Sequence, residues 1–66
     1  MKEEIKDILN NPLIIEKMAE EVHKAYCKEY KKQKREEYWT KGDYSKLNEE
    51  TKEMDRTTVK AVLKML

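Results

Sequence analysis

The chain has 66 residues, of which 44% are charged, yet its formal net charge is only +1. This length allows one domain at most. One cysteine and one histidine exclude an intrachain disulfide and a four-ligand Cys/His zinc site. The near-neutral total argues against a dedicated nucleic-acid-binding protein. We therefore predict a single domain over residues 1–66, with no metal and no cofactor.

Targeting signals are missing from the sequence pattern. No apolar run approaches the roughly 20 residues that a membrane span needs. The first residues, Met1 to Glu4, lack the apolar core of a signal peptide. A lone cysteine, Cys27, is typical of a reducing compartment. These patterns predict a cytoplasmic location and no membrane partner.

Two helices are expected in the first half of the chain. The first spans residues 2–10, and the second begins at Pro12 with Asn11 as its N-cap, because proline suits the first helical position. The second helix is expected to run over residues 12–34. Its apolar arc contains Ile14, Ile15, Met18, Ala19, Val22, Ala25, Tyr26 and Tyr30. The basic run Lys28–Arg35 lies toward its C-terminal end, where cations suit the helix dipole.

An aromatic segment, Tyr38–Tyr44, follows the second helix. It holds three of the five aromatic side chains and the only glycine, Gly42. Trp39 and Tyr44 either close the small core, which is the favoured interpretation, or stack on a ligand base. We expect this segment to fold down between the second and third helices.

A third helix is predicted from Glu49 to the end, capped by Asn48 and packed antiparallel to the second helix. Its apolar arc, expected to face the core, contains Met54, Thr58, Ala61, Val62, Met65 and Leu66. Val59 and Leu63 fall outside this arc. They are interpreted either as exposed residues or as a contact surface for a dimer or another partner.

Several side chains are candidates for chemistry, each with an ordinary alternative. His23 is more often a hydrogen-bonding boundary residue than a functional one. Cys27, one turn later, is expected to be a buried or half-buried inert thiol, since no third group activates it. Lys52 and Arg56, at i and i+4, either hold an anion or pair with neighbouring carboxylates such as Glu49.

Part of the sequence resembles the RyR domain, the small repeat of ryanodine receptors and of stand-alone bacterial and phage proteins. The resembling residues are Met18 to Cys27, with His23 followed by Tyr26-Cys27, and then Leu47, Lys52-Glu53 and Arg56. Asp55 stands where the family commonly has asparagine. The resemblance implies a helical, non-enzymatic module that binds a nucleotide-like ligand. The residues that would surround this ligand are His23, Tyr26, Trp39, Tyr44, Lys52 and Arg56.

The sequence thus predicts an all-α fold: a small three-helix domain with an aromatic loop between the second and third helices. The expected function is capture of a small anionic, nucleotide-like ligand in the cytoplasm of a bacterium or its phage. We also expect a homodimer, because the core is thin. The alternatives are a protein-interaction module that docks through the C-terminal helix, and a nucleic-acid-binding regulator that uses Lys28–Arg35.

Overall fold

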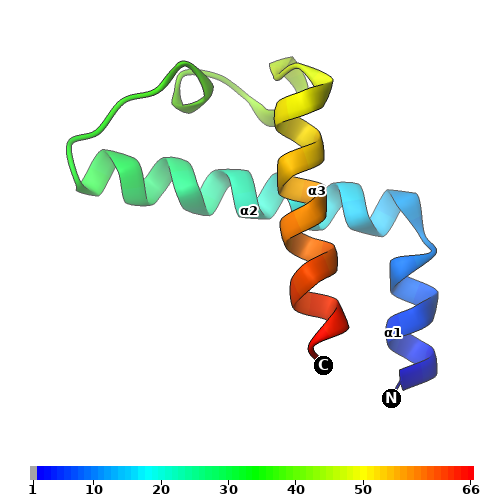
Figure 1. Ribbon diagram of the computed structural model, residues 1–66. Coiled ribbons are helices and arrows are strands. Elements are labelled where there is room, and N and C mark those ends of the chain that lie inside the picture. The colour runs from blue at the N-terminus through cyan, green and yellow to red at the C-terminus, as the bar shows by residue number, and fades with distance from the viewer. Residues whose placement is uncertain (1) are drawn as a thin grey trace.

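The structure is a computed structural model that describes residues 2–66, so Met1 of the predicted domain lies outside the described residues. Three α-helices, α1 (Lys2–Leu9), α2 (Pro12–Lys32) and α3 (Glu49–Lys64), make up most of it (Figure 1). Two short 3-10 helices, η1 (Tyr38–Thr40) and η2 (Tyr44–Lys46), lie in the segment between α2 and α3, which we call the connector (residues 33–48). The all-α prediction is confirmed.

Both predicted caps are present. The side chain of Asn11 accepts hydrogen bonds from the backbone N–H groups of Leu13 and Ile14, at 3.1 and 3.3 Å. Asn48 accepts from the N–H of Thr51 at 2.8 Å at the start of α3. These bonds satisfy backbone donors that have no partner within the helix. They explain why the starts of α2 and α3 were predictable.

The end of α2 is set by a left-handed residue. Lys34 has φ 57°, the N–H of Lys34 donates to the carbonyl of Lys31, and the N–H of Arg35 donates to that of Tyr30. This pair of bonds is the Schellman motif, in which glycine is the usual left-handed residue. The motif ends α2 at Lys32, two residues before the predicted end.

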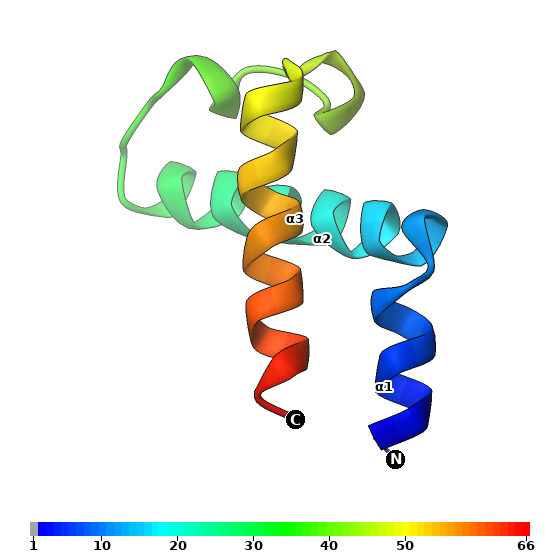
Figure 2. The same ribbon diagram turned by 45° about the vertical axis from the view of Figure 1, so that its right-hand side comes forward.

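The helices are arranged as a crossing and not as an antiparallel pair of α2 and α3. In Figures 1 and 2, α3 passes across the middle of α2, while α1 lies beside α3 and runs in the opposite direction. The predicted antiparallel packing of α3 on α2 is therefore wrong. The crossing leaves the C-terminal half of α2 without a helical neighbour, and the connector covers part of that half.

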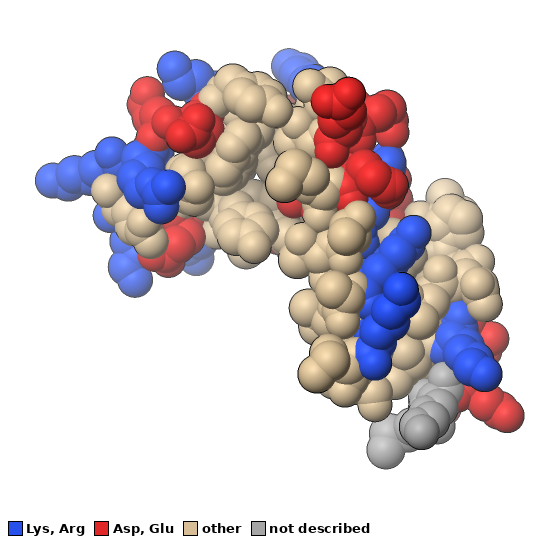
Figure 3. Space-filling model, viewed as in Figure 1, with Lys and Arg blue, Asp and Glu red and all other residues tan. Residues whose placement is uncertain are grey.

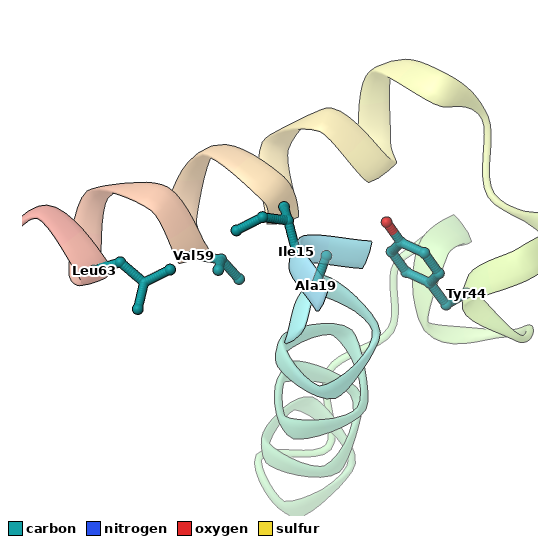
Figure 4. Close-up of a cluster of buried hydrophobic side chains, with 5 residues drawn as sticks. All are labelled: Ile15, Ala19, Tyr44, Val59 and Leu63. Atoms are coloured by element: carbon teal, nitrogen blue, oxygen red, sulfur yellow. The ribbon is translucent and has the colours of Figure 1, made fainter. Parts of the chain in front are cut away.

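A small core forms where α2 and α3 cross. Figure 4 shows Ile15 and Ala19 of α2 next to Val59 and Leu63 of α3, with Tyr44 of the connector completing the cluster. Ile5, Ile8 and Leu9 of α1 pack against this cluster together with Met18, Val22 and Leu47. The predicted role of the connector as a cover for the core is confirmed for Tyr44, which is 6% exposed.

The buried face of α3 is not the predicted one. Val59 and Leu63 are 6% and 8% exposed, whereas Val62 and Met65 are 58% and 85% exposed. Both interpretations of Val59 and Leu63, as exposed residues or as a contact surface for a dimer or another partner, are therefore wrong. The buried stripe is narrow because α3 meets α2 only where the two helices cross, and Asp55 continues it toward the N-terminal end of α3. The predicted apolar arc instead faces away from the core, with Met54 and Leu66 also exposed.

Candidate functional site

A partly open pocket lies between α2, the connector and the first half of α3. Its volume is about 410 Å³, within the range of small-ligand sites. It is lined by four aromatic side chains and five others: Tyr26, Tyr30, Tyr38, Trp39, His23, Thr51, Met54, Asp55 and Thr58. We call it the aromatic pocket. Figure 3 shows uncharged side chains gathered around this part of the molecule.

Trp39 organises the aromatic wall. Its ring centroid lies 4.6 Å from that of Tyr30, with the planes at 60°, and 6.4 Å from that of Tyr26, with the planes at 78°. Tilted and edge-to-face pairs of this kind are favourable for aromatic rings. The guanidinium of Arg35 lies over the Tyr30 ring, 4.2 Å from its centroid. The rings thus meet at steep angles, and all three line the same pocket.

One wall of the pocket comes from α3. Thr51, Asp55 and Thr58 are spaced at i, i+4 and i+7, which places them on one helix face. The Thr51 hydroxyl lies 2.6 Å from the Tyr38 hydroxyl, a hydrogen bond that ties the connector to α3. Thr58 donates its hydroxyl to the carbonyl of Met54 at 2.9 Å.

Asp55 is the unusual residue of this wall. Its side chain is 9% exposed, and its Oδ2 is buried with no hydrogen-bond partner among the described residues. Burial raises the pKa of this carboxyl above its ordinary value, and attraction to His23 opposes the shift. Buried polar groups in folded proteins almost always have partners, so the unpaired Oδ2 of Asp55 is an exception among the side chains of this wall.

His23 and Cys27 lie on the neighbouring turns of α2. His23 is 4% exposed, and its Nε2 lies 3.3 Å from the carbonyl oxygen of Gly42, to which it can donate. The Sγ of Cys27 lies 3.4 Å from the same Nε2. Burial, assisted by the charge of Asp55, raises the pKa of the Cys27 thiol. A raised pKa disfavours the thiolate, so this pair is not arranged as an activated nucleophile. The predicted half-buried state of Cys27 is confirmed.

The six predicted ligand residues separate into two groups. His23, Tyr26 and Trp39 line the aromatic pocket. Tyr44, Lys52 and Arg56 do not, and they belong instead to a polar network that joins the connector and α3 to α2. The sequence thus predicted three of the nine residues that line the pocket, together with two cations that lie elsewhere.

Glu16 of α2 is the centre of this network. The Tyr44 hydroxyl donates to Glu16, and Arg56 donates to it through Nε and Nη2, each at 2.9 Å. These hydrogen bonds, Tyr44 first and then Arg56, hold the pKa of the Glu16 carboxyl below its ordinary value. Arg56 also reaches Glu49 at 3.0 Å, and Lys52 lies 3.8 Å from the same carboxylate. Both predicted anion-binding cations are therefore already paired with carboxylates.

A second hollow, the basic cleft, lies at the C-terminal end of α2 against the connector. Five cations and three other residues line it: Lys28, Lys31, Lys34, Arg35, Lys41, Cys27, Glu36 and Thr40. Lys41 lies 3.6 Å from Glu36. In Figure 3 basic side chains gather at this end of α2, far from the acidic side chains over the start of α3.

Comparisons with models of protein families, with curated proteins and with solved structures gave no match for this chain. None of the helices in residues 2–66 has both the length and the apolar character of a membrane-crossing segment. Over the same residues, no group of three or more His, Cys, Asp and Glu side chains is placed to hold a metal ion. The assignment of function therefore rests on the geometry of the pocket and the clefts around it.

Proposed function

We propose that this chain is a non-catalytic binding module whose ligand enters the aromatic pocket. The unpaired carboxylate of Asp55 in the pocket wall is the observation that carries the proposal. Such a group lowers the stability of the fold, and groups of this kind are retained where they bind something. The neighbouring rings of Tyr26, Tyr30 and Trp39 supply the apolar contact area that small-ligand sites use.

Trp39 offers a direct test, because it is the only tryptophan of the chain and lines the pocket. A panel of cationic, neutral aromatic and anionic small molecules should include at least one that changes its fluorescence saturably. The Tyr26→Ala variant should lower the affinity for that ligand. Tyr26 is half-exposed, so truncation of its side chain spares the core. If no compound changes Trp39 emission or the melting temperature, the proposal fails.

A nucleotide-like ligand, expected from the RyR resemblance, is a second candidate. The resemblance has no support from the comparisons, so the basic cleft is what favours this candidate. A phosphate on Lys31 or Lys34 requires ionic contacts that weaken as salt rises. The test is titration with nucleotides and cyclic dinucleotides at low and high salt, with Lys31→Ala as the variant. The same titration with duplex DNA and RNA tests the nucleic-acid alternative.

Self-association through α3 is the remaining candidate. Val62, Met65 and Leu66 are exposed apolar residues at and just beyond the C-terminal end of α3, and Met54, about two turns earlier on the same helix, is also exposed. A second copy that covered this surface would give the homodimer predicted from the thin core. Sedimentation equilibrium tests it: Val62→Asp should yield monomer if the unmodified chain is dimeric. A monomer at every concentration would exclude the dimer.

The proposed setting is the cytoplasm of a bacterium or its phage, as the sequence led us to expect. A free Cys27 thiol is compatible with a reducing compartment. Localisation of a tagged chain in bacterial cells tests this part of the proposal.

A further inference from the structure

We propose that the aromatic pocket selects a methylated ammonium group, held by the faces of Trp39 and Tyr26 and by the carboxylate of Asp55. This inference rests on the proposed function and names the class of ligand for the same pocket. It replaces the anion expected from the sequence with a cation.

The charges around the pocket favour a cation. Among the described residues, Asp55 is the only Asp, Glu, Lys or Arg in the pocket lining, and its Oδ2 has no hydrogen-bond partner. An anion placed here would be repelled by that carboxylate. The two cations nearest along α3, Lys52 and Arg56, are paired with carboxylates and do not line the pocket.

The rings favour the same ligand. A cation within about 6 Å of an aromatic centroid is attracted by the negative face of the ring, and tryptophan gives the strongest attraction. The planes of Tyr26 and Trp39 lie at 78°, and those of Tyr30 and Trp39 at 60°, and all three rings line the pocket. Arg35 already lies over Tyr30 at 4.2 Å, which shows a cation on one of these rings in the folded chain.

The hydrogen-bonding groups distinguish a methylated ammonium from a primary one. A primary ammonium needs three acceptors when it leaves water. The Tyr38 and Thr51 hydroxyls are bonded to each other, and Thr58 donates to the Met54 carbonyl. His23 lies against the Gly42 carbonyl. The Oδ2 of Asp55 is buried, so it offers a ligand in the pocket its negative charge and not an accessible hydrogen-bond acceptor. A quaternary ammonium needs that charge and no hydrogen bonds.

Two sources offer this group: a free small molecule of the choline type, and the methylated side chain of a lysine in another protein. Both present the same trimethylammonium head to the rings. The pocket, at about 410 Å³, has room for the head and a short aliphatic stem. Choline and a peptide that carries trimethyllysine are therefore both used as probes, and whichever binds more tightly identifies the source.

The experiment is titration followed by Trp39 fluorescence and by calorimetry near neutral pH. The probes are choline, the trimethyllysine peptide, its unmethylated form and the neutral tert-butyl isostere of choline. We expect one trimethylammonium probe to bind and its uncharged or unmethylated counterpart to bind about tenfold more weakly. Asp55→Asn should weaken the cationic probe about tenfold and leave the neutral isostere unchanged.

Asp43→Asn provides the matched control, because it removes the same charge from an exposed residue outside the pocket. It should leave affinity for the cationic probe unchanged. Equal binding of choline and its neutral isostere, or an Asp55→Asn variant with unchanged affinity, would overturn the inference while leaving the pocket as a binding site. If only anionic or neutral compounds of the wider panel bind, the inference also fails and the proposed function stands. If no compound of any class binds, both fail.

Discussion

Arg56 of α3 and Glu16 of α2 are 40 positions apart in the chain, and the guanidinium of Arg56 donates twice to one carboxylate oxygen of Glu16, at 2.9 Å each. The Tyr44 hydroxyl donates to the other oxygen of the same carboxylate. One side chain thus joins all three elements that meet at the crossing. This network fixes the position of α3, from which Asp55 reaches the aromatic pocket.

Glu16→Gln should lower the free energy of unfolding by about 1 kcal/mol, a modest value because Glu16 is partly exposed and its ion pair is screened by solvent. Chemical denaturation measures the change. Glu20→Gln is the control: the Glu20–Lys24 pair at 3.3 Å lies on an exposed face, and its loss should have almost no effect. Equal effects of the two variants would show that the network adds nothing to stability.

The pH dependence of unfolding should contain two opposing contributions. The native pKa of Glu16 is lowered, so its contribution is fully present above its ordinary value of 4.5 and is lost as the pH falls through the lowered value. The native pKa of Asp55 is raised from 3.8, so its ionisation costs stability as the pH rises through 3.8 toward the raised value. Denaturation curves of Glu16→Gln should show less loss in acid. An unchanged pH profile in both Glu16→Gln and Asp55→Asn would contradict this account.

Asp55→Asn should raise the free energy of unfolding by about 1 kcal/mol near neutral pH, because a neutral amide costs less to bury than an unpaired carboxylate. The same variant should lose affinity for the cationic ligand, so stability and binding change in opposite directions. Thermal denaturation measures the change in stability. Asp43→Asn is the control, and it should leave stability unchanged. A destabilised Asp55→Asn would indicate that the carboxylate has a structural partner after all.

Val59→Ala and Val62→Ala form a matched pair on α3. Val59 is buried in the core, and its truncation should cost about 2 kcal/mol through lost contacts and the cavity left behind. Val62 is 58% exposed, and its truncation should change stability by less than about 0.5 kcal/mol. Denaturation of the two variants in parallel decides which face of α3 is inside. The reverse order would restore the face predicted from the sequence.

Lys34→Gly should stabilise the chain by about 1 kcal/mol, because lysine is strained at φ 57° and glycine is not. Lys32→Gly, inside the last turn of α2, should instead destabilise it by about 1 kcal/mol. Thermal unfolding of both variants gives the sign of each change in stability. If Lys34→Gly does not stabilise the chain, the left-handed turn after α2 is not present in solution.

The helices could be predicted because their signals are local. Asn11, Pro12 and Asn48 each act on backbone groups within three residues, so their roles are written in neighbouring positions. The burial of Tyr44 followed from the scarcity of large apolar residues in a chain without phenylalanine. Tyr30 and Tyr38 were missed as pocket residues. For Tyr30 the signal was its spacing of one helical turn from Tyr26, which places both rings on one face of α2. For Tyr38 it was its position in the aromatic segment that faces them.

The face of α3 and the charge network could not be predicted, because both depend on how the helices cross. The predicted apolar arc of α3, which includes Met65 and Leu66, contains more apolar residues than the narrow stripe of Val59 and Leu63. The crossing of the helices nevertheless buries the narrow stripe. Glu16 lies outside the predicted apolar arc of α2, and its partner Arg56 is too far along the chain for any local pattern to join them. The unpaired state of Asp55 is also a consequence of tertiary packing.

The most direct test of the central claim is a map of backbone and indole N–H resonances of the full chain during titration with the trimethylammonium probe that binds. We predict that the largest shifts fall on Trp39, Tyr26 and Asp55, with the signals of Lys52 and Lys31 unmoved. Shifts centred on Lys31 and its neighbours in the basic cleft, with Trp39 unaffected, would contradict the assignment of the aromatic pocket as the binding site.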